Sequence, residues 1–202
     1  MAVDAAKMGR EAQHARLMEG LAASIREKGL AQTQVTDIVR HARASRRTFY
    51  NHFEDKEACF VELMNTLSDA FLDEVDRSID PGAPIATQID QAIDTYLSLV
   101  TSDPGLTQTF ASASTGERIV MAQRQAFERY AALIVSVIES DSERDPRVEP
   151  VSVERAYLLV SGLHHTLVRA LVRGEELDRV SYEFKAVMKL VLSGSPASAG
   201  SA

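Results

Sequence analysis

The sequence has very little of what secreted and membrane-spanning proteins need. Among its 202 residues there is a single cysteine, Cys59, which excludes an internal disulfide framework and fits a reducing cytoplasm. The longest nearly unbroken apolar run covers residues 131–138, whereas a membrane-spanning helix needs roughly 20 apolar residues. No secretory signal is visible in the polar first residues. The sequence therefore predicts a cytoplasmic protein without a membrane partner.

Motifs of common enzymes and metal sites are missing as well. The sequence has no HExxH, no Cys-x-x-Cys, no glycine-rich phosphate loop and no GxSxG. His164 and His165 are adjacent, so on a helix they point about 100° apart and do not chelate one metal ion together. Cys59 is expected to be a small buried residue, because no second cysteine can resolve an oxidised form as a redox switch requires. We therefore expect neither an enzyme nor a bound metal or cofactor.

The excess of acidic residues is unevenly distributed. The formal net charge is −7, which by itself argues against a nucleic-acid partner. Residues 1–56, however, hold ten Lys/Arg and seven Asp/Glu, a net charge of +3, and residues 57–202 hold twelve and twenty-two, a net charge of −10. A basic head on an acidic remainder indicates that one end of the chain meets a polyanion.

Helical periodicity dominates the sequence, and no strand-like alternation of useful length appears. Leu17, Leu21 and Ile25 recur every four residues, and Gly29 is expected to end the helix that holds them. Asp55 is a good N-cap for a long fourth helix. Such segments predict an all-α protein of about nine helices, with a three-helix head (1–54), an α-helical body (55–192) and a disordered tail (193–202).

The stretch ASRRTFYNHFEDK, residues 44–56, combines charged and aromatic residues in a way that needs two different faces. With Ser45 as N-cap of a short helix, Phe49 and Phe53 lie one turn apart and face the other helices. The remaining positions carry groups that suit phosphate oxygens and base edges in a major groove. Lys56, in the first turn of the next helix, is expected to bind a phosphate there. The pattern favours a helix-turn-helix over a solvated, charge-rich helix on an ordinary bundle.

The longer stretch VTDIVRHARASRRTFYNHFEDKEACF, Val35 to Phe60, closely resembles the DNA-binding signature of the TetR family of bacterial transcriptional regulators. The likeness lies in the fixed spacing of Ile38, Ala42, Ser45, Thr48, Phe49, Tyr50, Phe53, Lys56 and Glu57. It implies a helix-turn-helix head, joined by a long fourth helix to an α-helical regulatory and dimerisation body. It also implies a homodimer that grips two operator half-sites on double-stranded DNA.

Three positions depart from the family pattern. Arg43 stands where the family usually has glycine in the turn between helices, and a positive φ there would cost on the order of 1 kcal/mol. Ala44 replaces a common valine, which thins the packing of the turn. Gln34 replaces a frequent threonine, so we expect Thr33 to cap the second helix.

The candidate DNA contacts are polar residues of the second and third helices and the start of the fourth. By resemblance, those that touch mainly the DNA backbone are Thr48, Tyr50, His52 and Lys56. Those at positions that vary in the family, and would set sequence preference, are Arg46, Arg47 and Asn51. The set is completed by Thr33, Thr36 and Ser45.

The helix expected at residues 152–173 is apolar on two sides. One side centres on Val160, and the opposite side carries Gly162, which lets a second helix approach closely. Such a helix can pack against its own domain with one side and against a partner subunit with the other. The resemblance likewise implies that the last two helices form the dimer interface. The alternative is that both sides belong to one monomer's core. The predicted dimer residues are Leu158, Gly162, His165, Arg169, Val172, Phe184 and Met188.

Aromatic residues are spread over the central helices, where such residues ordinarily form core. By resemblance, they line a cavity for a small, largely apolar molecule, with Gln123 and tyrosine hydroxyls fixing its position. His164 is either a hydrogen-bonded core histidine or part of this lining. The candidate lining residues are Met64, Phe71, Tyr96, Phe110, Gln123, Phe127, Tyr130 and His164.

These features predict a DNA-binding transcriptional regulator, in first place a repressor that binds a palindromic operator as a homodimer and is released by a small-molecule effector. Two alternatives stay open. One is an activator controlled by a protein partner, and the other is a ligand-binding helical bundle that does not bind DNA. The operator sequence, the regulated genes and the effector cannot be read from the residues.

Overall fold

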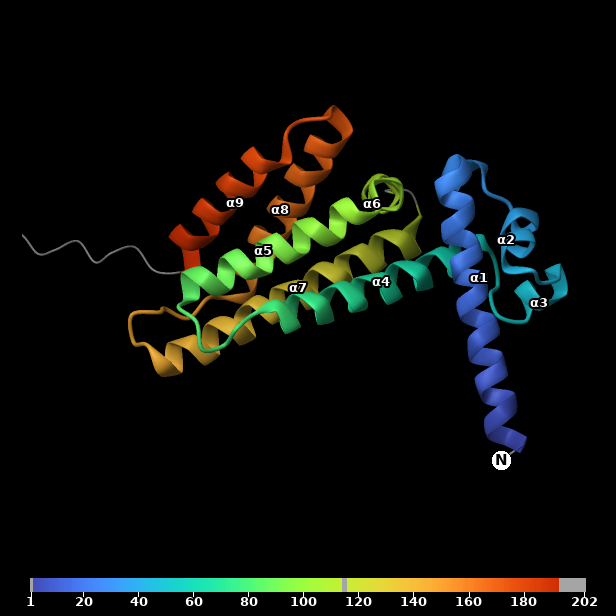
Figure 1. Cartoon of the computed structure of the whole chain (residues 1–202), viewed down its shortest axis with the longest axis horizontal. Coiled ribbons are helices and arrows are strands. Elements are labelled where there is room, and N and C mark those ends of the chain that lie inside the picture. Colours follow the sequence, from blue (N-terminus) through green and yellow to red (C-terminus); the bar gives the residue numbers. More distant parts are fainter. Residues whose placement is uncertain (1, 114–115, 193–202) are drawn as a thin grey trace, which may run out of the picture. The chain divides into compact units, whose positions relative to one another are not determined.

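Helices joined by short turns and loops make up the part of the chain that the structure describes (Figure 1). This computed structural model describes residues 2–113 and 116–192, with side chains from residue 7 onward, and the tail expected at 193–202 lies outside them. The described residues contain no strand and nine helices: α1 (Ala2–Gln32), α2 (Val35–Ala42), α3 (Arg46–Tyr50), α4 (Lys56–Ser78), α5 (Ile85–Ser102), α6 (Pro104–Ser112), α7 (Glu117–Arg144), α8 (Val153–Arg173) and α9 (Leu177–Leu192). The predicted all-α architecture is confirmed. No helix among these residues is apolar over a length that could cross a membrane.

The helices form two compact units. The head unit consists of Met1–Leu67 and Gly105–Gln123, and the second unit of Ser68–Pro104 and Arg124–Ala202. The boundaries fall within α4 and α7, so each of these helices contributes to both units. The predicted division into a head of 1–54 and a body of 55–192 stays a prediction.

Close packing of α1 against α2 organises the head unit. Leu17, Leu21 and Ile25 are all buried, as their four-residue spacing predicts. Gly20 lies between them on the same helix, and a Cβ atom there would be 2.5 Å from the carbonyl oxygen of Ile38. Only a residue without a side chain permits this approach, so Gly20 sets the distance between the two helices.

The helix ends around α2 agree with the sequence in one case and differ in another. The helical backbone breaks at Gly29, which has φ 77° and ψ 160°, before a last turn reaches Gln32. The prediction that Thr33 caps α2 is wrong. The N-cap is Gln34, whose N–H donates to the carboxylate of Asp37 at 2.8 Å. Thr33 is instead 2% exposed, and its hydroxyl donates to the carbonyl oxygen of Gly29.

The second unit is built around a separate apolar core. Ile93 of α5, Ile138 of α7 and Leu167 of α8 are nearly inaccessible to solvent, and they belong to one cluster. The hydroxyl of Ser152 accepts from the N–H of Arg155 and so begins α8, as N-caps do. The head unit and the second unit therefore each have an apolar core of their own.

Candidate nucleic-acid interface

The turn between α2 and α3 has the left-handed backbone that the family usually gives to glycine. Arg43 has φ 50° and ψ 46°, and its N–H donates to the carbonyl oxygen of Arg40. Ala44 then donates from its backbone N–H to the carbonyl oxygen of Val39 at 2.9 Å. The turn thus keeps its shape without glycine, at the cost expected for a side chain with positive φ.

Helix α3 begins and packs as its sequence predicts. The hydroxyl of Ser45 accepts from the N–H of Thr48 at 3.0 Å, which confirms Ser45 as N-cap. Phe49 and Phe53 are 0% and 4% exposed, with ring centroids 5.5 Å apart. The aromatic face of α3 therefore packs inside the head unit. The opposite face of the helix does not take part in this packing.

That other face presents polar side chains to solvent. Arg46, Arg47 and Asn51 are exposed, and Tyr50 keeps 52% of its surface accessible. Thr48 is half-buried, with its hydroxyl 2.8 Å from that of Ser45. Two guanidinium groups, a phenol and an amide thus share one short helix and its C-terminal turn. This combination can bind both phosphate oxygens and the donor and acceptor pattern of a major groove.

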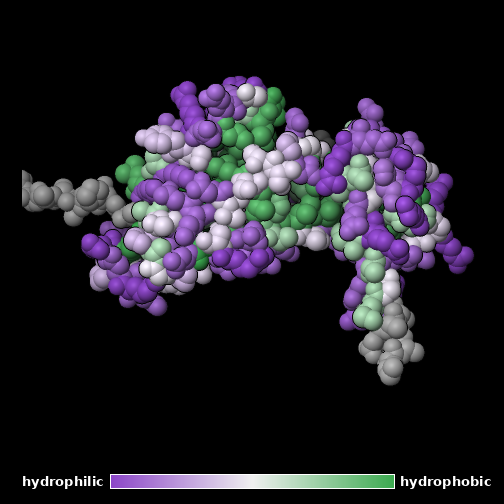
Figure 2. Space-filling view, viewed as in Figure 1, coloured by the Kyte–Doolittle hydropathy of each residue, from purple (hydrophilic) through white to green (hydrophobic). Residues whose placement is uncertain are grey.

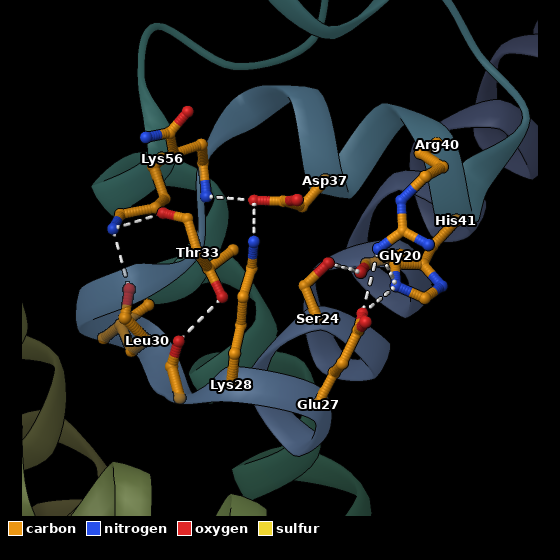
Figure 3. A network of polar contacts seen from close by, with 12 residues as sticks. Gly20, Ser24, Glu27, Lys28, Leu30, Thr33, Asp37, Arg40, His41 and Lys56 are labelled. Carbon is orange, nitrogen blue, oxygen red and sulfur yellow. Dashed lines mark hydrogen bonds and ion pairs between the residues drawn. The ribbon is translucent and has the colours of Figure 1, made fainter.

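Lys56 occupies a different environment from the one expected. Its ammonium group donates to the carbonyl oxygens of Leu30 and Thr33, both at 2.8 Å, across the end of α1 (Figure 3). Burial also lowers the pKa of Lys56. Two of its three N–H donors therefore satisfy backbone carbonyls inside the protein. Lys56 fastens α1 to α4, a structural role that spacing alone did not reveal.

The two threonines assigned to the interface have different surroundings. Thr33 is buried, so its side chain is not presented to a macromolecular partner. Thr36 is exposed on the first turn of α2. The structure therefore keeps only one of the two on the surface of the head unit.

A network of charged groups holds α2 against α1 (Figure 3). The ammonium of Lys28 lies 2.6 Å from the carboxylate of Asp37, and hydrogen bonding to Lys28 lowers the pKa of that carboxyl. The carboxylate of Glu27 is 2.9 Å from both Arg40 and His41, and hydrogen bonds from His41 and then Arg40 lower its pKa. These pairs orient α2, and sequence analysis missed them because they join residues of different helices.

Arg118 gathers three acidic residues near the start of α4. Its guanidinium donates to Asp55 at 2.6 Å and to Glu57 at 3.1 Å, and it lies 3.5 Å from Glu54. Asp55 also accepts from the N–H of Ala58 at 2.7 Å, so it caps α4 as predicted. The hydrogen bond from Ala58 and then that from Arg118 lower the pKa of Asp55. This contact places a residue of α7 beside the helix-turn-helix within the head unit.

His52 takes part in a contact with α1. Its Nδ1 lies 3.4 Å from Nδ1 of His14, whose other ring nitrogen is hydrogen-bonded to Glu62. The ring of His14 also packs on Phe53, with centroids 4.5 Å apart. Burial, followed by the charges of His14 and Arg10, lowers the pKa of His52. His52 is half-buried at the edge of the polar face rather than fully presented by it.

The candidate ligand-lining residues divide between the two units. Met64 and Phe110 belong to the core of the head unit, and Gln123 donates from its side-chain amide to the carbonyl oxygen of Phe110 at 2.7 Å. The other five, which we call the aromatic cluster, lie in the second unit: Phe71, Tyr96, Phe127, Tyr130 and His164.

The aromatic cluster packs around the half-buried imidazole of His164. The hydroxyl of Tyr96 is 3.4 Å from Nδ1 of His164, and the ring of Phe127 is 5.0 Å from the imidazole, centroid to centroid. The ring of Tyr130 packs edge-on against that of Tyr96, and its hydroxyl donates to the carbonyl oxygen of Ser68. Burial lowers the pKa of His164 to about 4, so its imidazole is neutral near neutral pH. The cluster is apolar with few polar groups, as small-molecule sites commonly are.

The predicted dimer residues of α8 all lie on its exposed side. Leu158 is 72% and Val172 58% exposed, and a Cβ atom added to Gly162 would contact nothing within 4 Å in the protomer. His165 and Arg169 are exposed on the same helix. Apolar surface of this extent on one side of a helix is unusual unless another surface covers it.

On α9, the residues assigned to the interface do not face outward. Met188 is 7% exposed, and Phe184 packs against the core of the second unit. The residues that α9 leaves exposed are Tyr182 at 71%, Leu190 at 65% and Val187 at 45%. Phe184 and Met188 therefore lie on the side of α9 that faces the core of the second unit.

The described residues hold neither a metal-binding cluster nor an accessible thiol. Among them, no three His, Cys, Asp or Glu side chains come together as a metal site. Cys59 is buried in the head unit as expected, and burial raises the pKa of its thiol to about 12. A protonated, inaccessible thiol is a poor nucleophile.

Residues 17–63 match the family model of the bacterial regulatory proteins of the tetR family. The matched region covers the packed part of α1, both helices of the turn and the first part of α4. This region therefore matches the DNA-binding part of the tetR family, and the described chain shares the overall fold of solved TetR-family regulators. No match to a curated protein was found.

Solved structures of similar fold include two regulators named FadR, each from a Bacillus species. FadR from Bacillus subtilis, crystallised with stearoyl-CoA, is 20% identical with a TM-score of 0.70, covering 90% of this chain and 98% of its own. The fatty acid degradation regulator FadR from Bacillus halodurans is 16% identical with a TM-score of 0.71, covering 91% and 96%. A TetR-like transcriptional regulator from Rhodococcus sp. RHA1 is 18% identical with a TM-score of 0.63, covering 91% and 97%. At such identities the likeness concerns the fold alone.

Proposed function

We propose that the protein is a homodimeric transcriptional regulator, acting in the cytoplasm, that binds a palindromic operator through α2 and α3. The observation that carries this proposal is the division of labour on α3. Phe49 is buried, whereas Arg46, Arg47, Tyr50 and Asn51 are on the exposed side of the helix and its C-terminal turn. A helix held by one face and polar on the other is what a major groove accepts.

DNA binding is tested by selecting bound sites from genomic DNA and measuring affinity for them in rising salt. A regulator of this kind shows saturable, salt-steep and sequence-dependent binding. Tyr50→Ala should weaken binding to all sequences, because the phenol contacts the backbone. Arg47→Ala should cost on the order of 1–3 kcal/mol at one base pair of each half-site. Identical effects of both changes on selected and random DNA would contradict the base-reading role.

Dimerisation is proposed through the exposed faces of α8 and α9. Leu158 and Val172 supply the apolar part of α8, and Tyr182 and Leu190 supply that of α9. Two helices from each protomer would form a four-helix interface around a two-fold axis. A two-fold protein matches a palindromic site, since each protomer then meets an identical half-site.

An effector site is proposed in the aromatic cluster of the second unit. Tyr96 and His164 supply polar atoms among apolar rings, which suits a lipophilic molecule with one polar group. The structural relative crystallised with stearoyl-CoA makes long-chain acyl compounds the first to test. Thermal unfolding with stearoyl-CoA, stearate and free coenzyme A would show which, if any, raises the melting temperature. Tyr96→Phe should reduce the shift if the hydroxyl binds the ligand.

We also propose that the protein is a repressor, which the effector releases from DNA. Two measurements together test this. The same compound must bind the second unit and weaken binding to selected DNA. A compound that strengthens DNA binding would favour an activator or a co-repressor. Ligand binding by a protein that shows no salt-steep DNA binding would favour the helical bundle without DNA function.

A further inference from the structure

Helix α1 is longer than the part of it that packs. Its first buried residue is Leu17, and residues 7–12 are all exposed, with Met8 at 63%. Figure 1 shows the first turns of α1 extending away from the rest of the head unit. The family signature also begins at residue 17, so nothing in that signature assigns a task to this extension.

The extension carries positive charge on one side. Lys7, Arg10 and His14 are spaced by three and four residues, so they share one face of the helix, which we call the basic stripe. Arg16 lies on the opposite face, roughly 150° away. Glu11 forms only a weak pair with Lys7, at 3.9 Å between two largely exposed side chains. Such a pair contributes little, and a stronger anion can replace it.

His14 fixes where the stripe points. Its ring packs on Phe53 and faces His52 at 3.4 Å between Nδ1 atoms, while Glu62 holds its second nitrogen. The stripe therefore starts directly beside the end of α3. Burial, then the charges of His14 and Arg10, lower the pKa of His52. Because the helix is regular, Lys7 continues the stripe about 5 Å further along the axis.

We propose that Lys7 and Arg10 bind backbone phosphates of double-stranded DNA next to the base pairs that α3 reads. This inference rests on the proposed DNA-binding function and adds a contact outside the helix-turn-helix. Two observations support DNA as the occupant: the stripe is continuous with the candidate interface, and its cations complement phosphate. A helix fixed in register loses less conformational entropy on binding than a flexible arm would.

The test compares the full-length protein with the double variant Lys7→Gln/Arg10→Gln and with the control Arg16→Gln. The probe is a fluorescein-labelled, mixed-sequence duplex of about 40 base pairs, followed by anisotropy in rising salt. Removing two phosphate contacts should lower the magnitude of the salt slope by about 2 per bound protomer. Affinity near physiological salt should fall roughly 30-fold, whereas Arg16→Gln should change neither quantity measurably.

The outcomes separate this inference from the proposed function. Wild-type protein without saturable, salt-steep binding would contradict the proposed function itself. Wild-type binding with an unchanged slope in the double variant would overturn the basic stripe alone. An equal loss in Arg16→Gln would also overturn it, since the effect would then reflect net charge rather than position. Circular dichroism should report wild-type helicity in both variants, because all three substituted residues are exposed.

Discussion

The head unit and the α8–α9 pair use helices in opposite ways. In the head unit, the apolar side chains of α2 and α3 are inside, and the exposed positions of α3 carry Arg46 and Arg47. On α8 and α9, large apolar side chains such as Leu158 and Tyr182 remain exposed. Figure 2 shows the contrast on one face of each region, with a mainly hydrophilic head and hydrophobic side chains beside the α8–α9 turn. This difference indicates that the exposed face of α3 suits a polyanion, whereas the exposed faces of α8 and α9 suit another apolar surface.

The largest expected effect is a loss of stability when the buried face of α3 is changed. Phe49→Ala should destabilise the head unit by roughly 3–5 kcal/mol, because Phe49 is 0% exposed and its removal leaves a cavity. Chemical denaturation measures the loss. Tyr50→Ala is the matched control and should cost less than about 1 kcal/mol, since the phenol is half exposed. Equal losses in the two variants would mean that α3 does not have two distinct faces.

The apolar surface of α8 gives the second effect. Leu158→Glu should weaken a dimer at least ~100-fold, because two leucine side chains are lost from the interface and two carboxylates enter it. Sedimentation velocity at several concentrations measures this. Val153 is also an exposed apolar residue of α8, at 54%, but it lies roughly 140° away around the helix. Val153→Glu should leave assembly unchanged, and a Leu158→Glu variant that stays dimeric would place the interface elsewhere.

The third prediction concerns the second unit, where His164 should make the free energy of unfolding depend on pH. His164 has a pKa of about 4 in the fold, against about 6.5 in an unfolded chain. Between these values the unfolded chain binds more protons, so the free energy of unfolding should fall as pH drops from about 6.5 to about 4, by at most about 3 kcal/mol.

Denaturation across this pH range, in wild type and in His164→Gln, measures that dependence. The variant should lose most of the slope between about pH 6.5 and pH 4. His165→Gln is the control and should retain most of it, since burial is the main cause of the lowered pKa of His164 and the charge of His165 comes second. A slope that survives in His164→Gln would mean that other groups carry the pH dependence.

The fourth prediction tests whether Lys56 stabilises the fold or binds a DNA phosphate. Lys56→Ala removes two charge-assisted hydrogen bonds to the carbonyl oxygens of Leu30 and Thr33, and it should cost roughly 1.5–3 kcal/mol of stability. Arg46→Ala, at an exposed position, should cost almost nothing in the same denaturation experiment. If Lys56→Ala keeps full stability and only flattens the salt dependence of DNA binding, the phosphate contact expected from the sequence is the correct one.

The smallest effect concerns the turn before α3. Arg43→Gly should raise stability by up to about 1 kcal/mol, because glycine adopts φ 50° without strain but loses more freedom on folding. Thermal unfolding measures the gain. Arg40→Gly, three residues earlier within the helical backbone of α2, should instead lower stability by about 1 kcal/mol. A loss in both variants would show that the side chain of Arg43 stabilises the turn more than its backbone strains it.

Local features were predictable from the sequence, and long-range ones were not. The cap at Ser45, the buried pair of Phe49 and Phe53, and the break at Gly29 each follow from residues within one or two turns. The contacts of Lys56 and Arg118 depend on residues of other helices, which spacing does not bring together. A periodic pattern tells which residues share a face but not which neighbour that face meets.

The body illustrates the same limit in two ways. The α9 prediction selected Phe184 and Met188 as interface residues, whereas the fold uses them in its own core. The ligand-lining set came from aromatic content, and the structure divides it, with Phe110 in one unit and Phe127 in the other. Neither the register of a helix against its neighbour nor the unit to which a side chain belongs is encoded in composition.

The head unit is discontinuous along the chain, and this affects how it is made. Its second stretch, Gly105–Gln123, includes Phe110, whose ring lies 5.4 Å from that of Phe60. A ribosome adds about 5–20 residues per second, so on the order of 3–10 s pass between synthesis of Leu67 and of Gln123. During that interval the nascent helices α1 to α4 lack the partners that Leu106 and Ile119 provide in the finished core. The order of translation therefore delays completion of the head unit's core until more than half of the polypeptide has been synthesised.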